Sequence, residues 1–177
     1  GGTVLEVAWP AGPGDFAMKH NYGDALSTHP WYFAGADDLE FMPGWDTAAL
    51  DVALLNDAKV IGTNDLANPS VMRGDHATHI LFDSEYVTET GCTWHDGPGF
   101  VYSEAYDHQY VDNEAVCVAR ERGVWAFAGN SHVKHHHPIF DPATKMDDTY
   151  RKALAKGALD RNVFLRRQRL AQASRAR

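Results

Sequence analysis

The stretch WYFAGADDLEF, residues 31–41, joins an aromatic, apolar run to a cluster of acids. Aromatic side chains suit the packed surface of a sheet, so the run is predicted to be a buried strand. Three carboxylates then fall within four positions, on Asp37, Asp38 and Glu40. Because open α/β sheets bind ligands just beyond the carboxyl ends of their strands, we expect the edge of a binding site at this junction.

Carboxylates that lie this close together repel one another unless a positive group sits among them. A divalent cation with oxygen ligands, Mg²⁺ or Mn²⁺, is the usual solution. The alternative is a solvated acidic turn in which Asp38 caps a helix, because short acidic motifs also occur without a function.

The composition indicates a single globular domain with an uneven charge. The chain has 177 residues, enough to bury a core, and its hydrophobic content of 44% argues against disorder. Residues 151–177 hold nine Lys and Arg against one acid, whereas residues 1–150 hold seven against 23. The body is therefore a poor non-specific binder of nucleic acid, and only the tail is basic enough for an anionic partner.

Cysteine usage and hydropathy predict a cytoplasmic protein. Cys92 and Cys117 form neither a disulfide framework nor the spacing of a zinc site, so both are expected to be reduced thiols. No apolar run approaches the roughly 18–20 residues of a membrane span, and no signal peptide opens the chain.

Strands alternate with helices along the chain, which predicts an α/β layered domain. Further strands are expected at residues 3–8, 59–63, 80–82 and 124–128. Helices are expected at residues 16–26, where Asp15 would be the cap, and at 47–56, 84–90, 113–122 and 148–173.

Two more polar clusters stand at predicted element boundaries. Asp112 lies where a helix is expected to begin, and His135 and His137 follow a predicted strand. A metal held by carboxylate and imidazole, with a separate carboxylate as base, is a coherent catalytic set. The alternatives are histidines that line a surface and an Asp112 that caps its helix.

The order and spacing of these clusters resemble the second half of GT-A glycosyltransferases, most closely those of family 2 and the short glycosyltransferases of bacteriophages. The acidic metal motif of that family, Asp-x-Asp, falls on residues 35–37, where Gly35 replaces the first Asp and Asp37 keeps the second. The Pro-Gly-Trp that follows the acids in the family resembles residues 43–45.

Two later motifs carry the same resemblance. The family has a Glu-Asp pair that opens a helix ending in Arg-x-x-Gly, and residues 111–123 are similar, with Val111 in place of the Glu and Asp112 as the Asp. The closing histidine of the family, after a Ser-x-Val-x-His turn, is similar to His135.

The resemblance covers about residues 4–150 and implies an incomplete nucleotide-diphospho-sugar transferase fold, a GT-A-like layered sheet with flanking helices. Residues 1–150 would be its catalytic portion and residues 151–177 a basic C-terminal helix. Roughly sixty residues that would hold the base and ribose are expected before Val4. Their absence implies a truncated or cleaved product, or a complementing second chain.

By this resemblance the protein is a metal-dependent glycosyltransferase, phage-encoded and in the host cytoplasm, that moves a sugar from a nucleotide-sugar donor to an acceptor hydroxyl with inversion. Asp37 and His135 would bind Mn²⁺ or Mg²⁺, with His137 as a rival ligand, and Asp112 would be the base. The acceptor is left open among nucleic acid, protein and glycan. The residues expected to contact substrate are Lys19, Asn21, Asp38, Gly74, His76, His79, Trp94, Glu114, Asp148 and Tyr150.

Several alternatives stay open. A metal-dependent hydrolase would use the same acids and histidines, and a non-catalytic or partner-complemented subunit would fit the missing half. Lys19 and Asn21 also suit a solvated helix face, and Trp94 also suits core packing. Asp148 and Tyr150 fit a lid over the donor.

The basic tail is expected to be an amphipathic helix. Leu159, Val163 and Leu170 would pack on the domain. Four arginines, Arg161, Arg166, Arg167 and Arg169, would face water or a partner. The alternatives are simple solvation, docking on the acidic body of a second copy in a homo-oligomer, and binding to an anionic acceptor.

Overall fold

A computed structural model describes residues 4–9 and 12–176 and contains one curled, mixed sheet of five strands in the order β1-β4-β3-β5-β2. The strands are β1 (Trp31–Ala34), β2 (Leu39–Phe41), β3 (Val60–Asn64), β4 (Ile80–Asp83) and β5 (Trp125–His135). β3 and β5 run parallel, and the other three neighbouring pairs are antiparallel.

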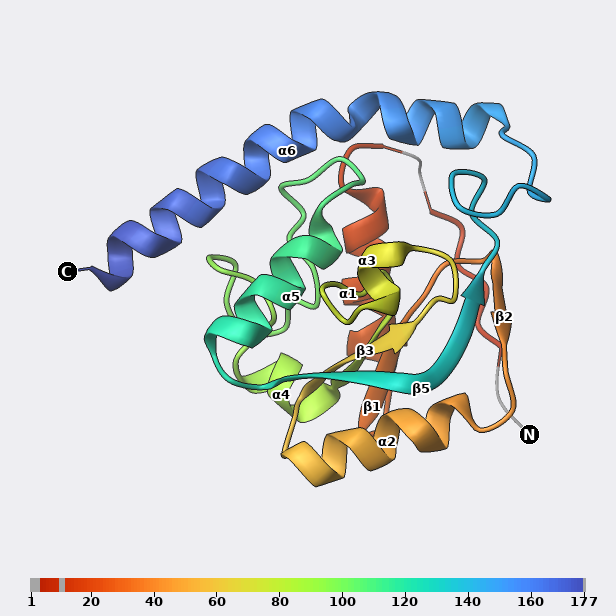
Figure 1. Cartoon of the computed structure of the whole chain (residues 1–177). Helices are drawn as coiled ribbons and strands as arrows, with labels where there is room; N and C mark the ends of the chain where they lie inside the picture. Colours follow the sequence, from red (N-terminus) through yellow and green to blue (C-terminus); the bar gives the residue numbers. More distant parts are fainter. Residues whose placement is uncertain (1–3, 10–11, 177) are drawn as a thin grey trace.

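Helices cover both faces of this sheet. They are α1 (Asp15–Leu26), α2 (Trp45–Asn56), α3 (Pro69–Met72), α4 (Ser84–Glu89), α5 (Val111–Glu121) and α6 (Asp148–Arg175). Figure 1 shows α2 along one side of the sheet, whereas α1 and α5 lie on the other side, below the long α6. Within the described ranges no helix is both long and apolar enough to cross a membrane.

The alternation of side chains along the strands builds two cores. On β3, Val60 packs with α1 and α5, and its neighbour Ile61 packs with α2. On β4, Phe82 packs in the core with α1 and α5, and Leu81 packs in the core with α2. β3 and β4 are therefore buried on both faces, which explains why they appear as short apolar runs in the sequence.

The α/β class with flanking helices is confirmed, with corrections at several boundaries. Residues 4–8 form no strand, and Thr3 lies outside the described residues. Asp15 does not cap α1, because Gly14 is the cap and Asp15 pairs with Lys19 at 3.0 Å. β5 extends through the predicted histidine turn to His135.

Two short elements are missing from the sequence prediction. α3 has four residues and β2 has three, too few for a periodic pattern. β2 begins directly after Asp38 and pairs with the last residues of β5, with Leu39 opposite His135. Asp38 therefore precedes a strand and does not cap a helix.

α6 contacts the domain through a stripe of charged residues rather than through leucines. Val163 and Phe164 reach the core, but Leu159 and Leu170 are 67% and 53% exposed, which corrects the expected packing of both. The carboxylate of Asp160 is buried and accepts hydrogen bonds from the backbone N–H groups of residues 107, 108 and 109.

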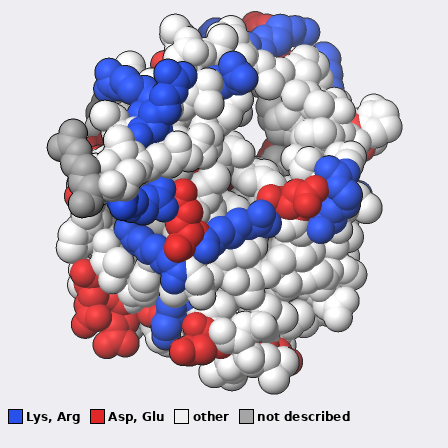
Figure 2. All heavy atoms as spheres, turned by 60° about the vertical axis from the view of Figure 1, so that its left-hand side comes forward, with Lys and Arg blue, Asp and Glu red and all other residues white. Residues whose placement is uncertain are grey.

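Bases of the tail pair with the body of their own chain. Lys156 lies 2.8 Å from Asp107, and Arg175 lies 2.9 Å from Glu121. Figure 2 shows basic and acidic side chains next to one another in a row across one face, rather than one continuous basic patch. Part of the positive charge of the tail is therefore neutralised within the molecule.

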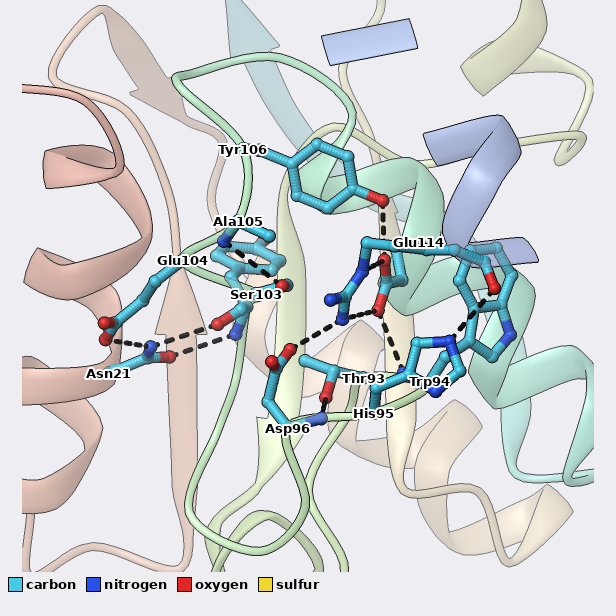
Figure 3. A network of polar contacts seen from close by, with 12 residues as sticks. Asn21, Thr93, Trp94, His95, Asp96, Ser103, Glu104, Ala105, Tyr106 and Glu114 are labelled. Carbon is cyan, nitrogen blue, oxygen red and sulfur yellow. Dashed lines mark hydrogen bonds and ion pairs between the residues drawn. The ribbon is translucent and has the colours of Figure 1, made fainter. Parts of the chain in front are cut away.

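The strongest of these contacts centres on Glu114, which is fully buried. Arg167 donates to both carboxylate oxygens, from Nε at 2.7 Å and from Nη2 at 2.8 Å. The Tyr106 hydroxyl and the Trp94 backbone N–H donate to the same carboxylate, and Arg167 also pairs with Asp96 at 2.7 Å. Figure 3 shows Glu114 with Tyr106, Trp94 and Asp96 around it.

This network corrects the expectation that Arg167 faces water or a partner. A carboxylate has about four acceptor positions, and here the protein fills each oxygen twice. A core tolerates an ion pair whose hydrogen bonds are all made. Removal of one partner leaves the other as an uncompensated charge in an apolar environment.

We predict that Arg167→Ala lowers the free energy of unfolding by about 3–5 kcal/mol, because it leaves Glu114 charged and unpaired in the core. The exposed neighbour Arg166 is the matched control. Arg166→Ala should change the free energy of unfolding by no more than about 0.5 kcal/mol. Urea unfolding of both variants measures the difference. Equal effects would show that the pair does not anchor α6.

Candidate active site

A cavity of about 860 Å³ opens at the carboxyl end of β1. Its wall comes from residues 34–38 after β1, from Thr78 and His79 before β4, and from His135 at the end of β5. The start of α5, the first turns of α1 and the beginning of α6 complete it. The binding edge predicted after the aromatic run is thus a real concavity.

Of the fourteen residues predicted for the site, eight line this cavity: Lys19, Asp37, Asp38, His79, Asp112, His135, His137 and Tyr150. The other six do not line it: Asn21, Gly74, His76, Trp94, Glu114 and Asp148. The three polar clusters singled out in the sequence therefore meet in one place, although they are far apart along the chain.

Asp38 and His135 form a close polar contact in the cavity. Oδ1 of Asp38 lies 3.2 Å from Nε2 of His135, within ion-pair distance but poorly aligned for a hydrogen bond. This buried oxygen has no hydrogen-bond partner among the described residues, whereas the Tyr150 hydroxyl donates to Oδ2. The His135 ring also makes edge contacts with the rings of His79 and His137, at centroid distances of 4.6 and 5.1 Å.

The predicted ligands Asp37, His135 and His137 do not form a three-ligand metal site. In residues 4–9 and 12–176, no group of three or more His, Cys, Asp or Glu side chains lies close enough to hold a metal. Asp37 lies at the exposed rim, while Asp38 reaches His135. The unpartnered oxygen of Asp38 beside the ring of His135 fits a cation that takes two ligands from the protein.

Asp112 is held in place by His76. Tyr110 is the N-cap of α5, so Asp112 is the second residue of the helix and not its cap. Its Oδ1 accepts a hydrogen bond from the backbone of Asn113 at 2.8 Å, and its Oδ2 lies 3.1 Å from Nε2 of His76. His76 is therefore not a wall of the cavity but the support of a residue that is.

The contact between Asp112 and His76 lowers the pKa of Asp112 and raises the pKa of His76. Burial alone would raise the pKa of Asp112, but the charge of His76 and its hydrogen bond outweigh burial and lower it. Burial alone would lower the pKa of His76, and the same contact with Asp112 raises it instead. Asp112 is consequently a charged, oriented carboxylate at the helix N-terminus, where negative charge is favoured.

His79 is a neutral imidazole in the wall of the cavity. His79 is only 3% exposed, and its Nε2 has no hydrogen-bond partner in the part of the chain that the structure describes. Burial, followed by the neighbouring His135, lowers the pKa of His79 to about 3. Thr63 fixes the backbone here, since its N–H and hydroxyl both donate to the carbonyl of His79.

An aromatic group that the sequence analysis did not single out lines the α1 side of the cavity. Phe16 packs edge-on against His20 and His108, and His20 Nδ1 lies 2.9 Å from the Tyr32 hydroxyl. Burial, followed by Lys19, lowers the pKa of His20 to about 4, and burial, followed by Asp24, raises that of Tyr32 to about 12. The four-residue spacing of Phe16 and His20 on one helix face was the signal available in the sequence.

Two of the residues outside the cavity, Asn21 and Trp94, have structural roles. The Asn21 amide donates to the backbone carbonyl of Tyr102 and to Glu104, and its oxygen accepts from the Tyr102 N–H, as Figure 3 shows for Asn21 and Glu104. Trp94 donates from its ring to Glu121 and packs on Phe164, which agrees with the alternative of packing rather than with a substrate contact.

The remaining predicted residues outside the cavity also make contacts within the protein. Glu114 anchors α6, as described above. Gly74 has φ +75°, a conformation that favours glycine, and its carbonyl accepts from Arg120 at 2.7 Å. The exposed Asp148 pairs with Arg151 one turn further along α6.

Comparison of the chain with protein-family models, with curated proteins and with solved structures finds no match.

The buried neutral histidine predicts an acid-sensitive fold. The unfolded chain protonates His79 near pH 6.5, whereas the folded chain resists protonation down to about 3, so stability is lost as the pH falls through this window. Between pH 6.5 and pH 5 the loss is about 2 kcal/mol from this residue. Urea unfolding at several pH values should show a shallower slope in His79→Gln, and identical slopes would contradict the assignment.

Proposed function

We propose that the protein is a metal-dependent glycosyltransferase that moves a sugar from a nucleotide-sugar donor to an acceptor hydroxyl with inversion. One observation carries this proposal: a single cavity is lined by the acidic pair Asp37 and Asp38, by Asp112 and by the histidines His135 and His137. Asp37, Asp112 and His135 are among the residues on which the resemblance to GT-A enzymes rests.

Asp38 and His135 would hold Mn²⁺ or Mg²⁺. Such ions commonly take one or two protein ligands and complete their shell with water and substrate phosphates, which agrees with two ligands rather than three. A bound cation would neutralise the charge that grows on the diphosphate as the sugar leaves. Tyr150 supports the arrangement, because its hydroxyl orients the second oxygen of Asp38.

Asp112 would be the general base. As the acceptor oxygen forms its bond to the anomeric carbon, its proton passes to Asp112, and the bond to the donor phosphate breaks with its electrons going to the diphosphate. His76 fixes the orientation of the carboxylate through its 3.1 Å contact. A base on one face of the sugar and a leaving group on the other give inversion.

Calorimetric titration of Mn²⁺ tests the cation site. Asp38→Asn should weaken binding by about tenfold or more, which is 1.4 kcal/mol. Asp37→Asn should keep most of the affinity, because Asp37 lies at the rim. Binding that depends on Asp37 and not on Asp38 would move the site to the rim and overturn the assignment.

Release of nucleoside diphosphate from a panel of nucleotide sugars with Mn²⁺ tests the reaction. Asp112→Asn should lower turnover by about 10²–10⁴-fold, the usual effect of losing a general base. Asp75→Asn is a matched control, since Asp75 is near His76 in sequence but pairs with Arg73 outside the cavity.

The products decide between the competing functions. Near-normal turnover by Asp112→Asn would remove Asp112 from the base role. Release of free sugar at an equal rate with and without acceptors would indicate a hydrolase. No turnover of any donor, with or without Mn²⁺, would indicate a non-catalytic subunit or one that needs a second chain.

A further inference from the structure

We infer that His79 hydrogen-bonds a hydroxyl group of an uncharged ligand and that the cavity selects neutral glycosides over anionic ones. The identification of this ligand with the acceptor rests on the proposed function, but the binding itself does not require it. No other role described above uses the free nitrogen of His79.

The first support is the unsatisfied nitrogen. His79 lines the cavity and is only 3% exposed. Its Nε2 has no hydrogen-bond partner among the described residues. Buried polar atoms of native proteins nearly always have a partner, and an exception indicates a ligand or an ordered molecule. A neutral ring nitrogen is either a donor or an acceptor, and a hydroxyl group complements both.

The second support is the position of His79. Its ring packs against His135 at a centroid distance of 4.6 Å, and it lines the same cavity as Asp112 and Asp38. It therefore lies beside the candidate cation site, in the cavity that also holds the candidate base. A sugar hydroxyl beside the reacting centre would come within reach of this nitrogen.

The third support is the charge of the wall. Four carboxylates line the cavity, from Asp37, Asp38, Asp112 and Asp147, against the single cation Lys19, which is already paired with Asp15. Burial lowers the pKa values of His20 and His108, two of the five histidines that line the cavity, so these two rings add little positive charge. A phosphate or carboxylate on the ligand would be repelled here unless a cation came with it.

The apolar part of the cavity lining supports a sugar as the neutral ligand. Phe16, Tyr32, Val111 and Leu154 contribute apolar surface to the same cavity. Sugars present an apolar face of C–H groups and a rim of hydroxyls, and aromatic rings with a few placed polar groups are the usual lining of small-molecule sites. This assigns a neutral glycoside, rather than nucleic acid, as the ligand of the cavity.

Ligand-observed NMR with the full chain, without metal or nucleotide, tests this inference. The probes are methyl glucoside, methyl galactoside and the methyl glycoside of N-acetylglucosamine, compared with glucose 6-phosphate and glucuronic acid. At least one neutral glycoside should bind, and its acidic analogues should bind more weakly. Equal or tighter binding of the acidic sugars, or no binding of any neutral glycoside at millimolar concentration, would overturn the inference.

Variants of His79 separate recognition from simple packing. His79→Phe keeps a ring but loses the hydrogen bond and should weaken glycoside binding by about 3- to 10-fold. His79→Gln restores a polar atom and should recover part of the affinity, and His29→Gln, outside the cavity, should bind normally. Unchanged binding by His79→Phe would show that the nitrogen does not contact the ligand.

The two proposals can fail separately. Glycoside binding that depends on His79, without turnover of any nucleotide sugar, would reject the transferase and keep the inference. Turnover with a phosphorylated or nucleic-acid acceptor would keep the transferase and reject the inference. If His79→Phe does not fold, the comparison of neutral and acidic probes on the wild type still decides.

Discussion

The ion pair between Glu114 and Arg167 is the interaction on which the geometry of the cavity depends. It is buried, and it ties α6 to α5. Glu114 follows Asp112 by two positions on α5, and residues two apart on a helix point to opposite sides. One helix therefore presents its candidate base to the cavity and its anchor to α6. The same α6 carries Tyr150 into the cavity wall, so a loss of the pair would disturb the site from a distance.

An irregularity in the pairing of β3 with β5 determines the position of Asp38 and His135 in the cavity wall. β3 and β5 stay in register up to Thr63 and Ala128, and then Asn64 pairs with His132. Such an irregularity bends a strand and increases its twist, and beyond it β5 turns away to pair with β2. Leu39 thereby comes opposite His135, and Asp38, one residue earlier, reaches the ring. The contact between Asp38 and His135 is thus produced by backbone geometry rather than by any local motif.

These two devices explain what the sequence could and could not predict. Regular elements and their order followed from apolar periodicity, and the acids and histidines at element ends were correctly expected to gather. The pairing of β2, the charged contact stripe of α6 and the roles of Asn21 and Trp94 depend on partners far away along the chain. His76 and His79 illustrate the limit: they are three residues apart and chemically identical, yet one supports Asp112 from behind and the other lines the cavity.

The charge distribution of the cavity sets different requirements for a charged ligand and for a neutral one. Its carboxylates outnumber the lysine and arginine side chains that line it among the described residues, so under the proposed function a diphosphate would enter only with a compensating cation. Under the proposed function, the pair of Asp38 and His135 would offer two ligands to such a cation and leave the rest of its shell to the phosphates. A neutral hydroxyl needs no such compensation and instead requires a fixed, uncharged partner. A protonated His79 would repel such a cation, so a ring that burial keeps neutral would allow the proposed donor and the neutral ligand to occupy one cavity.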